Sequence, residues 1–303
     1  DMVRFLPPQL ANLTFWFHHG DDASLQDDQQ DAMWNGLMQL TQLVYLYTPA
    51  KYPCPERFVR WMKQSQIAHL STTMYTADKQ LLKEVLPAMP SLRSIDVSPR
   101  LDRQTFALTP MVWMAPIIQT CTQLTRLDLR PDTSDYLTFL EALVGLTNLV
   151  HLHITTRNKE ETPASFFNLY LPNLTDLDTT MIITDKVVPA LADFLEHHSD
   201  LVRLCLSFSC HEGYDQSIAA LAKCTALTYL YREDMQSPNR PIVTFEPVPP
   251  SLRRFDWACY ARHPRQELTV PLDHTLAHFQ EKAYDNNIRR HQTLVDLHTD
   301  WFQ

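Results

Sequence analysis

Two histidines separated by one residue are the first candidates for chemistry in this sequence. His151 and His153 lie in the apolar segment LVHLHI, and residues two apart on a strand share a face. Asp128 and Asp178 occupy equivalent positions 25 residues earlier and later, about 4.8 Å away per strand if the segments pair side by side. Histidine and carboxylate together can hold Zn²⁺. Because the spacing dictates no fourth ligand, we interpret the group as a polar patch and expect no metal.

Cys205 is the second candidate, because Arg203 lies two residues before it and a neighbouring guanidinium can lower the pKa of a thiol. His153 would lie two strands away, about 10 Å, which is too far for direct proton transfer. The sequence has no GxSxG or HExxH motif, and its 4 glycines build neither a P-loop nor a dinucleotide fingerprint. We therefore expect no catalytic residue, no cofactor and no enzymatic activity.

The composition sets the class of protein and of partner. The 303 residues are 45% hydrophobic and 20% charged, enough for a sizeable core, and no apolar run reaches the length of a membrane helix. A net charge of −9 argues against binding a nucleic-acid backbone or an anionic membrane. The six scattered cysteines form no CxxC pair and indicate a reducing, intracellular compartment, cytoplasmic or nuclear.

The elements that must position these side chains are set by an internal repeat. One segment reads CTQLTRLDL over residues 121–129, and similar segments recur along the chain, mostly every 24–27 residues. The second apolar residue of each copy, which we name the anchor, is Leu13, Leu43, Ile67, Leu92, Leu124, Leu149, Leu174, Leu201, Leu227, Leu252 or Leu294. Each copy predicts one short strand, with the two apolar residues that follow the anchor directed into a core.

This pattern resembles the leucine-rich repeat family over nearly the whole chain. The resemblance implies an α/β fold: a solenoid (horseshoe) of about 11 repeats, with a concave parallel β-sheet and an irregular convex side of helices and loops. We expect one such domain over residues 1–303, truncated at one or both ends. The period and the helical returns look most like the intracellular F-box and ribonuclease-inhibitor types.

Three returns have helical spacing. They cover residues 136–146, residues 187–199 with Asp185 as a cap and Pro189 in the first turn, and residues 215–224 with Asp215 as N-cap. The proline-rich return over residues 236–250 is expected to be irregular. The family's asparagine after the strand is missing, and its place is taken by Asp132, Arg157, Ile182 and Ser209.

The repeat register predicts which side chains line the concave face. Aromatic residues lie toward the N-terminal end and around Leu227, and mixed charges lie between them. Aromatic and arginine side chains are typical anchors of interfaces. The expected partner-binding residues are Phe15, Phe17, Tyr45, Tyr47, Arg126, Asp128, His151, His153, Asp176, Asp178, Arg203, Tyr229, Tyr231, Arg254 and Asp256.

Three functions remain open at this point. The first is an intracellular protein-binding scaffold; the resemblance implies the substrate-recognition part of an F-box-type ubiquitin ligase, with the adaptor bound by a segment outside this sequence. A pathogen effector would use the same scaffold. The second is a structural subunit of a large assembly, which predicts apolar convex patches at residues 61–62, 111–114 and 166–167, unless these belong to the core. The third is an enzyme with a hydrolytic or metal site at His151 and His153.

Overall fold

The structure is a computed structural model in which the chain divides into two compact units, Asp1–Leu149 and Val150–Gln303. Each unit is described by itself. The residues that the structure describes are 9–14, 32, 35–49, 55–74, 79–99, 112–131, 136–155, 161–208, 219–234, 251–259, 279–283 and 290–294.

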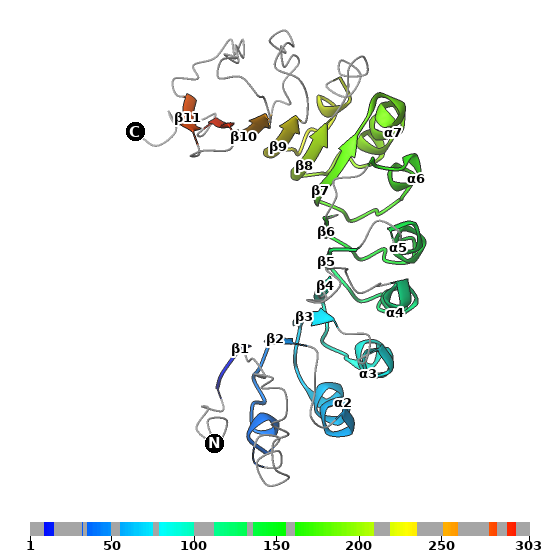
Figure 1. Ribbon diagram of the computed structural model, residues 1–303, viewed down its shortest axis with the longest axis vertical. Coiled ribbons are helices and arrows are strands. Elements are labelled where there is room, and N and C mark those ends of the chain that lie inside the picture. Colours follow the sequence, from blue (N-terminus) through cyan, green and yellow to red (C-terminus); the bar gives the residue numbers. More distant parts are fainter. Residues whose placement is uncertain are drawn as a thin grey trace, which may run out of the picture. The chain divides into compact units, whose positions relative to one another are not determined.

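The first unit has a parallel sheet backed by helices. Its strands pair in chain order: β1 (Asn12–Thr14), β2 (Tyr45–Pro49), β3 (His69–Met74), β4 (Ser94–Pro99) and β5 (Arg126–Leu129). The returns contain α2 (Pro55–Gln64), α3 (Lys79–Val85), η3 (Leu86–Ala88), η4 (Val112–Met114), α4 (Ala115–Thr120) and α5 (Tyr136–Leu143). Figure 1 shows these helices on one side of their strands, so that none of the described helices covers the other side of the sheet.

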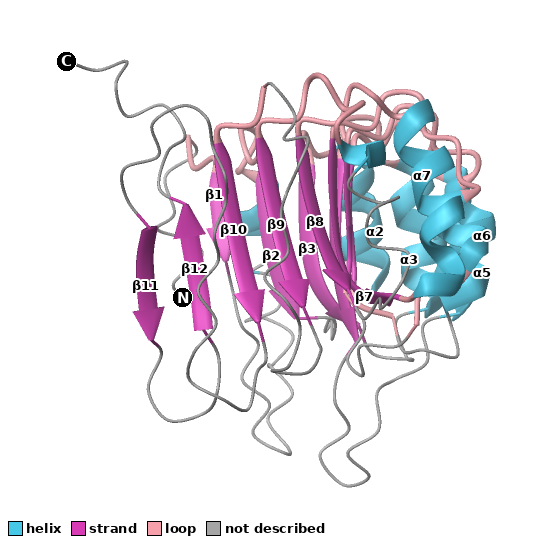
Figure 2. Ribbon diagram, turned by 90° about the horizontal axis from the view of Figure 1, so that it is seen from above, coloured by secondary structure: helices cyan, strands magenta, loops and turns pink. Residues whose placement is uncertain are grey.

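The second unit repeats this arrangement. Its parallel strands are β6 (His151–Ile154), β7 (Asp176–Ile183), β8 (Arg203–Phe208), β9 (Tyr229–Asp234) and β10 (Arg254–Cys259). The sheet ends in two antiparallel strands, β12 (Arg290–Leu294) beside β10 and then β11 (Phe279–Ala283). The returns include α6 (Ala164–Phe167), η6 (Asp185–Val187) and α7 (Val188–His197). Figure 2 shows the strands β8, β9 and β10 side by side.

The anchors explain why the strands stack in register. Those of the described copies from Leu43 to Leu252 are at most 4% exposed, so the anchors at the strand entries belong to the core as well. The residue after an anchor donates its backbone N–H to the carbonyl of the same position one repeat earlier, as in Ala68 to Val44 at 2.9 Å and Val202 to Thr175 at 2.8 Å. Thr228 adds its Oγ1, which donates to the Val202 carbonyl at 3.2 Å. This entry ladder holds consecutive strands at the same height within each unit.

The apolar strand residues that follow each anchor form the core of each unit together with the anchors. In the first unit, Leu46, Leu70, Ile95 and Leu127 are partners across β2 to β5, and each is buried. In the second unit, Leu152, Leu177, Leu204 and Leu230 do the same across β6 to β9. Parallel strands that bury one face, together with helical returns, give the α/β fold of a leucine-rich-repeat solenoid, as the resemblance implies.

The predicted helices were largely confirmed. The segment that starts at Tyr136 is α5, and Pro189 lies in the first turn of α7. The predicted cap was wrong: Asp185 lies in η6, and the N-cap of α7 is Val187, which has no side-chain capping bond, because a 3₁₀ turn leads directly into the helix. Residues 219–221 are helical, while Asp215 and residues 236–250 lie outside the described part.

Two further expectations concern the residues at the ends of the strands and the last copy of the repeat. Ile182, at one of the expected asparagine positions, lies inside β7, where the register with β8 shifts between Asp178 and Ile182. The other three positions, Asp132, Arg157 and Ser209, are outside the described residues. The copy that begins near Leu294 does not continue the parallel order over residues 290–294, since β12 is antiparallel. Within the described parts, every helix is too short or too polar to cross a bilayer.

Candidate functional site

The sheet of the second unit has one face toward the helices and one face with polar side chains. Burial alternates along β6 and β7, so that every second residue is partly exposed. Strand pairing aligns the first residues of β6, β7, β8 and β9 in one row: His151, Asp176, Arg203 and Tyr229. A second row lies two residues further along each strand and contains His153, Asp178, Cys205 and Tyr231. We call the described side chains of these two rows the β6–β9 face.

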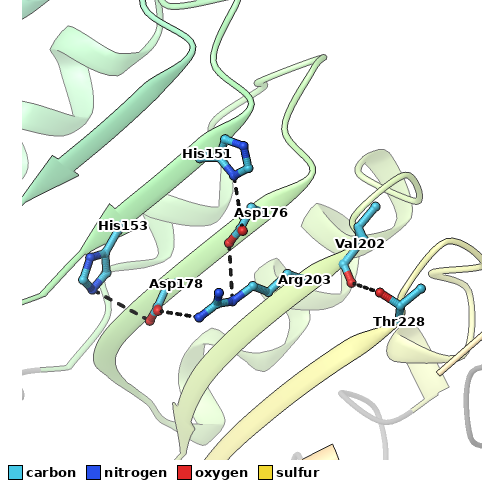
Figure 3. A network of polar contacts seen from close by, with 7 residues as sticks. All are labelled: His151, His153, Asp176, Asp178, Val202, Arg203 and Thr228. Carbon is cyan, nitrogen blue, oxygen red and sulfur yellow. Dashed lines mark hydrogen bonds and ion pairs between the residues drawn. The ribbon is translucent and has the colours of Figure 1, made fainter. Parts of the chain in front are cut away.

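The charged residues of the β6–β9 face form a continuous network (Figure 3). Asp176 lies between His151 and Arg203: its Oδ2 is 3.2 Å from His151 Nδ1, and its Oδ1 is 3.8 Å from Arg203 Nε. Asp178 lies between His153 and the same arginine: its Oδ1 is 4.0 Å from His153 Nε2, and its Oδ2 is 3.6 Å from Arg203 Nη2. One guanidinium therefore faces two carboxylates, and each carboxylate faces its own histidine.

Arg203 also lies over the ring of Tyr229, with the guanidinium carbon 5.1 Å from the ring centroid. This cation–π contact and the two carboxylates hold the guanidinium from different sides. The Arg203 side chain remains 48% exposed and that of His151 44% exposed, whereas Asp176 and Asp178 are 24% and 27% exposed. Exposed ion pairs of this kind contribute only about 0–1 kcal/mol to stability. The network therefore does little for the fold and leaves large polar side chains accessible.

Arg203 does not lower the pKa of the Cys205 thiol below its usual value, although a neighbouring guanidinium can do so. The thiol is 4% exposed, and burial raises its pKa to about 12, with the negative charge of Asp178 acting in the same direction. The nearby Arg203 lowers the pKa by less than these two effects raise it. Cys205 is therefore a protonated thiol at neutral pH and not a nucleophile. Cys121 and Cys224 are buried free thiols at the position where several other copies of the repeat have leucine.

The two histidines do not converge on a common centre. His151 contacts Asp176 and His153 contacts Asp178, so each imidazole has a different carboxylate partner. Among the residues described here, no group of three His, Cys, Asp or Glu side chains is arranged to hold a metal ion. The geometry supplies paired donors and acceptors for polar recognition.

The corresponding face of the first unit is built from other side chains. Tyr45 and Tyr47 on β2 are partly exposed, and Arg126 on β5 is exposed. Asp128 on the same strand is buried at 8% exposure. The closest contact that we identify here is a hydrogen bond that sequence reasoning missed: Ser71 Oγ donates to Asp96 Oδ2 at 2.8 Å. Only the equal position of these two residues in successive repeats could have indicated it.

Some predicted site residues have no described side chain. Phe15 and Phe17 lie outside the described residues. Tyr231 lies in β9, and Arg254 and Asp256 lie in β10, where strand pairing matches Tyr229 with Arg254 and Tyr231 with Asp256. These three are placed by register alone.

The apolar segments expected on the convex side are mostly core. Trp61, Met62, Met114, Phe166 and Phe167 are at most 4% exposed. Phe166 and Phe167 pack edge to face, and both rings lie near Phe194 of α7. Within the predicted patches, Val112 is exposed at 41%. The other exposed apolar residues lie elsewhere in the returns and at the strand entries: Met38, Val44, Leu137, Val144, Tyr170 and Val202.

No protein-family model and no curated protein sequence matches the chain. Among solved structures, the chain is similar to the structure described as "Crystal structure of TLR13-ssRNA13 complex", with 17% sequence identity and a TM-score of 0.37. The match covers 68% of this chain and 31% of that chain, so this chain spans about a third of the length of the similar structure. The fold assignment therefore depends on the repeat and the strand pairing.

Proposed function

We propose that this chain is a binding scaffold, not an enzyme, and that it holds a protein partner on the β6–β9 face. One observation carries the proposal: Arg203 lies over Tyr229 and beside two carboxylates, on a sheet face that none of the described helices of its unit covers. Arginine and tyrosine are enriched among residues that dominate binding energies. Because Arg203 contacts the ring and both carboxylates, these groups are arranged before a partner arrives, so the face loses little conformational freedom on binding.

The finer proposal is an intracellular receptor of the F-box type that presents a substrate to a ubiquitin ligase. The repeat period and the helices in the returns support this type. The buried free thiols of Cys121, Cys205 and Cys224 are in keeping with a reducing compartment. The net charge of −9 supports a protein partner over a nucleic acid or an anionic membrane.

The second candidate is a structural subunit of a large assembly. Leu137 in α5 and Val144 directly after it are 59% and 62% exposed, and their spacing of seven residues places them on one side of the helix. An apolar pair of this kind on the returns is what a permanent interface would bury.

The test is affinity capture from native extract with mass spectrometry, using the full-length gene product. The face variant is Asp176→Lys/Arg203→Glu, which exchanges the two charges and leaves the net charge unchanged. The matched control is Glu196→Lys/Lys223→Glu, which exchanges the exposed ion pair Glu196–Lys223 away from this face. We expect the face variant to lose its captured proteins and the control to keep them, with unchanged thermal midpoints.

The identity of the captured proteins separates the candidates. A ubiquitin-ligase adaptor and a cullin that are recovered with all three proteins, while other proteins are lost with the face variant, support the receptor. A fixed set of partners at constant stoichiometry, equal for all three proteins, supports the structural subunit and contradicts binding through the β6–β9 face.

A further inference from the structure

The polarity of the β6–β9 face points to the chemistry of its partner. We propose that the partner is a protein segment that presents a lysine or arginine side chain to Asp176 and Asp178. This inference rests on the proposed binding function and adds to it the sign of the charge that is recognised. It follows from how Arg203 contacts the two carboxylates, how far each group is exposed, and what an acidic segment would meet.

Arg203 contacts both carboxylates without saturating Asp176. Its Nε and Nη2 atoms are 3.8 and 3.6 Å from Asp176 and Asp178, beyond the distance of a good hydrogen bond. Asp176 takes one contact within hydrogen-bond distance, from His151 at 3.2 Å. An ionised carboxylate has about four lone-pair sites. Asp176 therefore keeps acceptor capacity for a further donor.

An acidic segment fits this face poorly. The in-plane edges of a guanidinium carry its donors, and two edge nitrogens of Arg203 already face Asp176 and Asp178. A partner carboxylate that approached Arg203 would be repelled by both aspartates. With the two histidines neutral, Asp176, Asp178 and Arg203 together carry one net negative charge, which favours a cation.

The relief of the face suits a long basic side chain. Arg203 and His151 are 48% and 44% exposed, while the side chain of Asp176 between them is 24% exposed; Asp178, beside Arg203 in the second row, is 27% exposed. A lysine or arginine can reach the less exposed carboxylates while its aliphatic stem packs along the more exposed Arg203 and His151 side chains. The charge of −9 on the whole chain also steers cationic segments toward the molecule.

The experiment pans a random peptide-display library against the full chain and measures the selected peptides by titration. We expect lysine and arginine to be enriched. The variant Asp176→Asn/Asp178→Asn should bind the selected peptides at least tenfold more weakly. The control Asp193→Asn/Asp200→Asn removes the same charge from exposed residues of the same unit, outside this face, and should stay within twofold.

A gain of binding provides the second arm, because misfolding cannot produce it. In Arg203→Gln the carboxylates lose their internal cation, so we expect the same basic peptides to bind at least threefold more tightly. An arginine that received an acidic partner would give the opposite result. Weaker binding of the basic peptides to Arg203→Gln overturns the proposal.

The remaining outcomes separate this inference from the proposed function. Selected peptides rich in Asp or Glu and lost in Arg203→Gln would keep a binding face and overturn its inferred polarity. A single-stranded oligouridylate probe that binds and is lost in the same variant would also overturn it. Peptides that bind the native chain, Asp176→Asn/Asp178→Asn and Arg203→Gln equally would place binding elsewhere and overturn both proposals.

Discussion

The two units carry the same frame and different faces. In the first unit, Ser71 and Asp96 form a 2.8 Å hydrogen bond, and Ser71, Ser94 and Asp128 are at most 8% exposed. In the second unit, the equivalent rows carry histidine, aspartate and arginine with side chains that are 24–48% exposed, and the partly exposed ring of Tyr229. The strands are held in both cases by the same backbone ladder. The face is therefore chemically independent of the frame: the first face has Tyr45, Tyr47 and Arg126 as accessible groups, whereas the second has a network of charged side chains.

The largest expected effect tests whether the cores of the two units are equivalent. Leu127 and Leu204 are fully buried row residues of the first and second unit. Leu127→Ala and Leu204→Ala should each lower the free energy of unfolding by about 2–5 kcal/mol, because each leaves a cavity. Urea denaturation measures both, with Val202→Ala as an exposed control that changes stability by no more than about 0.5 kcal/mol. A small cost in one unit alone would mean that the frames differ.

The next effect concerns the partner-binding surface. Tyr229→Ala removes the ring under Arg203, and we expect capture of the partner to fall at least tenfold, which corresponds to about 1.4 kcal/mol. Tyr45→Ala removes a partly exposed ring from the sheet face of the first unit and should change capture by less than twofold. Quantitative capture with each purified variant compares them. If Tyr45→Ala has the larger effect, the partner binds the first unit.

A smaller effect contrasts the polar contacts of the two faces. Ser71→Ala removes a buried donor from a carboxylate and should cost about 1–2 kcal/mol of stability. His151→Ala breaks a half-exposed pair and should cost about 0–1 kcal/mol. Chemical denaturation of the two variants at one pH gives both values. The reverse order would show that the exposed network stabilises the fold and is not reserved for binding.

The smallest effect is a dependence on pH that only the second unit has at this position of the repeat. His198 is 4% exposed; its Nδ1–H donates to the Phe194 carbonyl at 2.8 Å, and its Nε2 accepts from the Leu171 N–H at 3.2 Å. The ring also stacks on Phe194, with 4.0 Å between the ring centroids. The first unit has Met89, Cys121 and Leu146 at equivalent positions, and none of them gains a positive charge at low pH.

Burial lowers the pKa of His198 below its usual 6.5. The unfolded chain therefore takes up the proton first as the pH falls. The stability contributed by the neutral ring is complete above pH 6.5 and is lost below it. Thermal midpoints measured from pH 7.5 to 5 should fall less steeply for His198→Gln than for the native chain. Replacement of the exposed neighbour, His197→Gln, is the control, and an unchanged slope in His198→Gln would contradict the assignment.

The repeat predicted most of the frame because its signal is physical and recurrent. Each anchor fixes a strand and which residues of that strand face the core, so the rows of the face follow once the strands pair in order. The position of α5 and the first-turn Pro189 of α7 followed from helical spacing. The cap at Asp185 was wrong because a short 3₁₀ turn before α7 has no periodic signal of its own.

The chemistry of the candidate site was less predictable. The rows correctly placed Arg203 beside Asp178 and Cys205, but the pKa of the thiol depends on burial, which adjacent residue types do not give. Likewise, the sequence could not distinguish core from surface at residues 166–167, because two phenylalanines read alike in either place. The Ser71–Asp96 hydrogen bond required atomic positions.

The entry ladder has a consequence for how such a chain can evolve. Its main contacts join one backbone N–H to one backbone carbonyl, so no particular side chain is needed to add a repeat or to remove one. A duplicated segment of about 25 residues can join the ladder at once, and its outward positions are then free to vary. The diversity of the two faces in this chain is what such copying followed by independent drift would leave behind. The same property would let an engineer place the row from His151 to Tyr229 at the equivalent positions of four other consecutive repeats without rebuilding the strands.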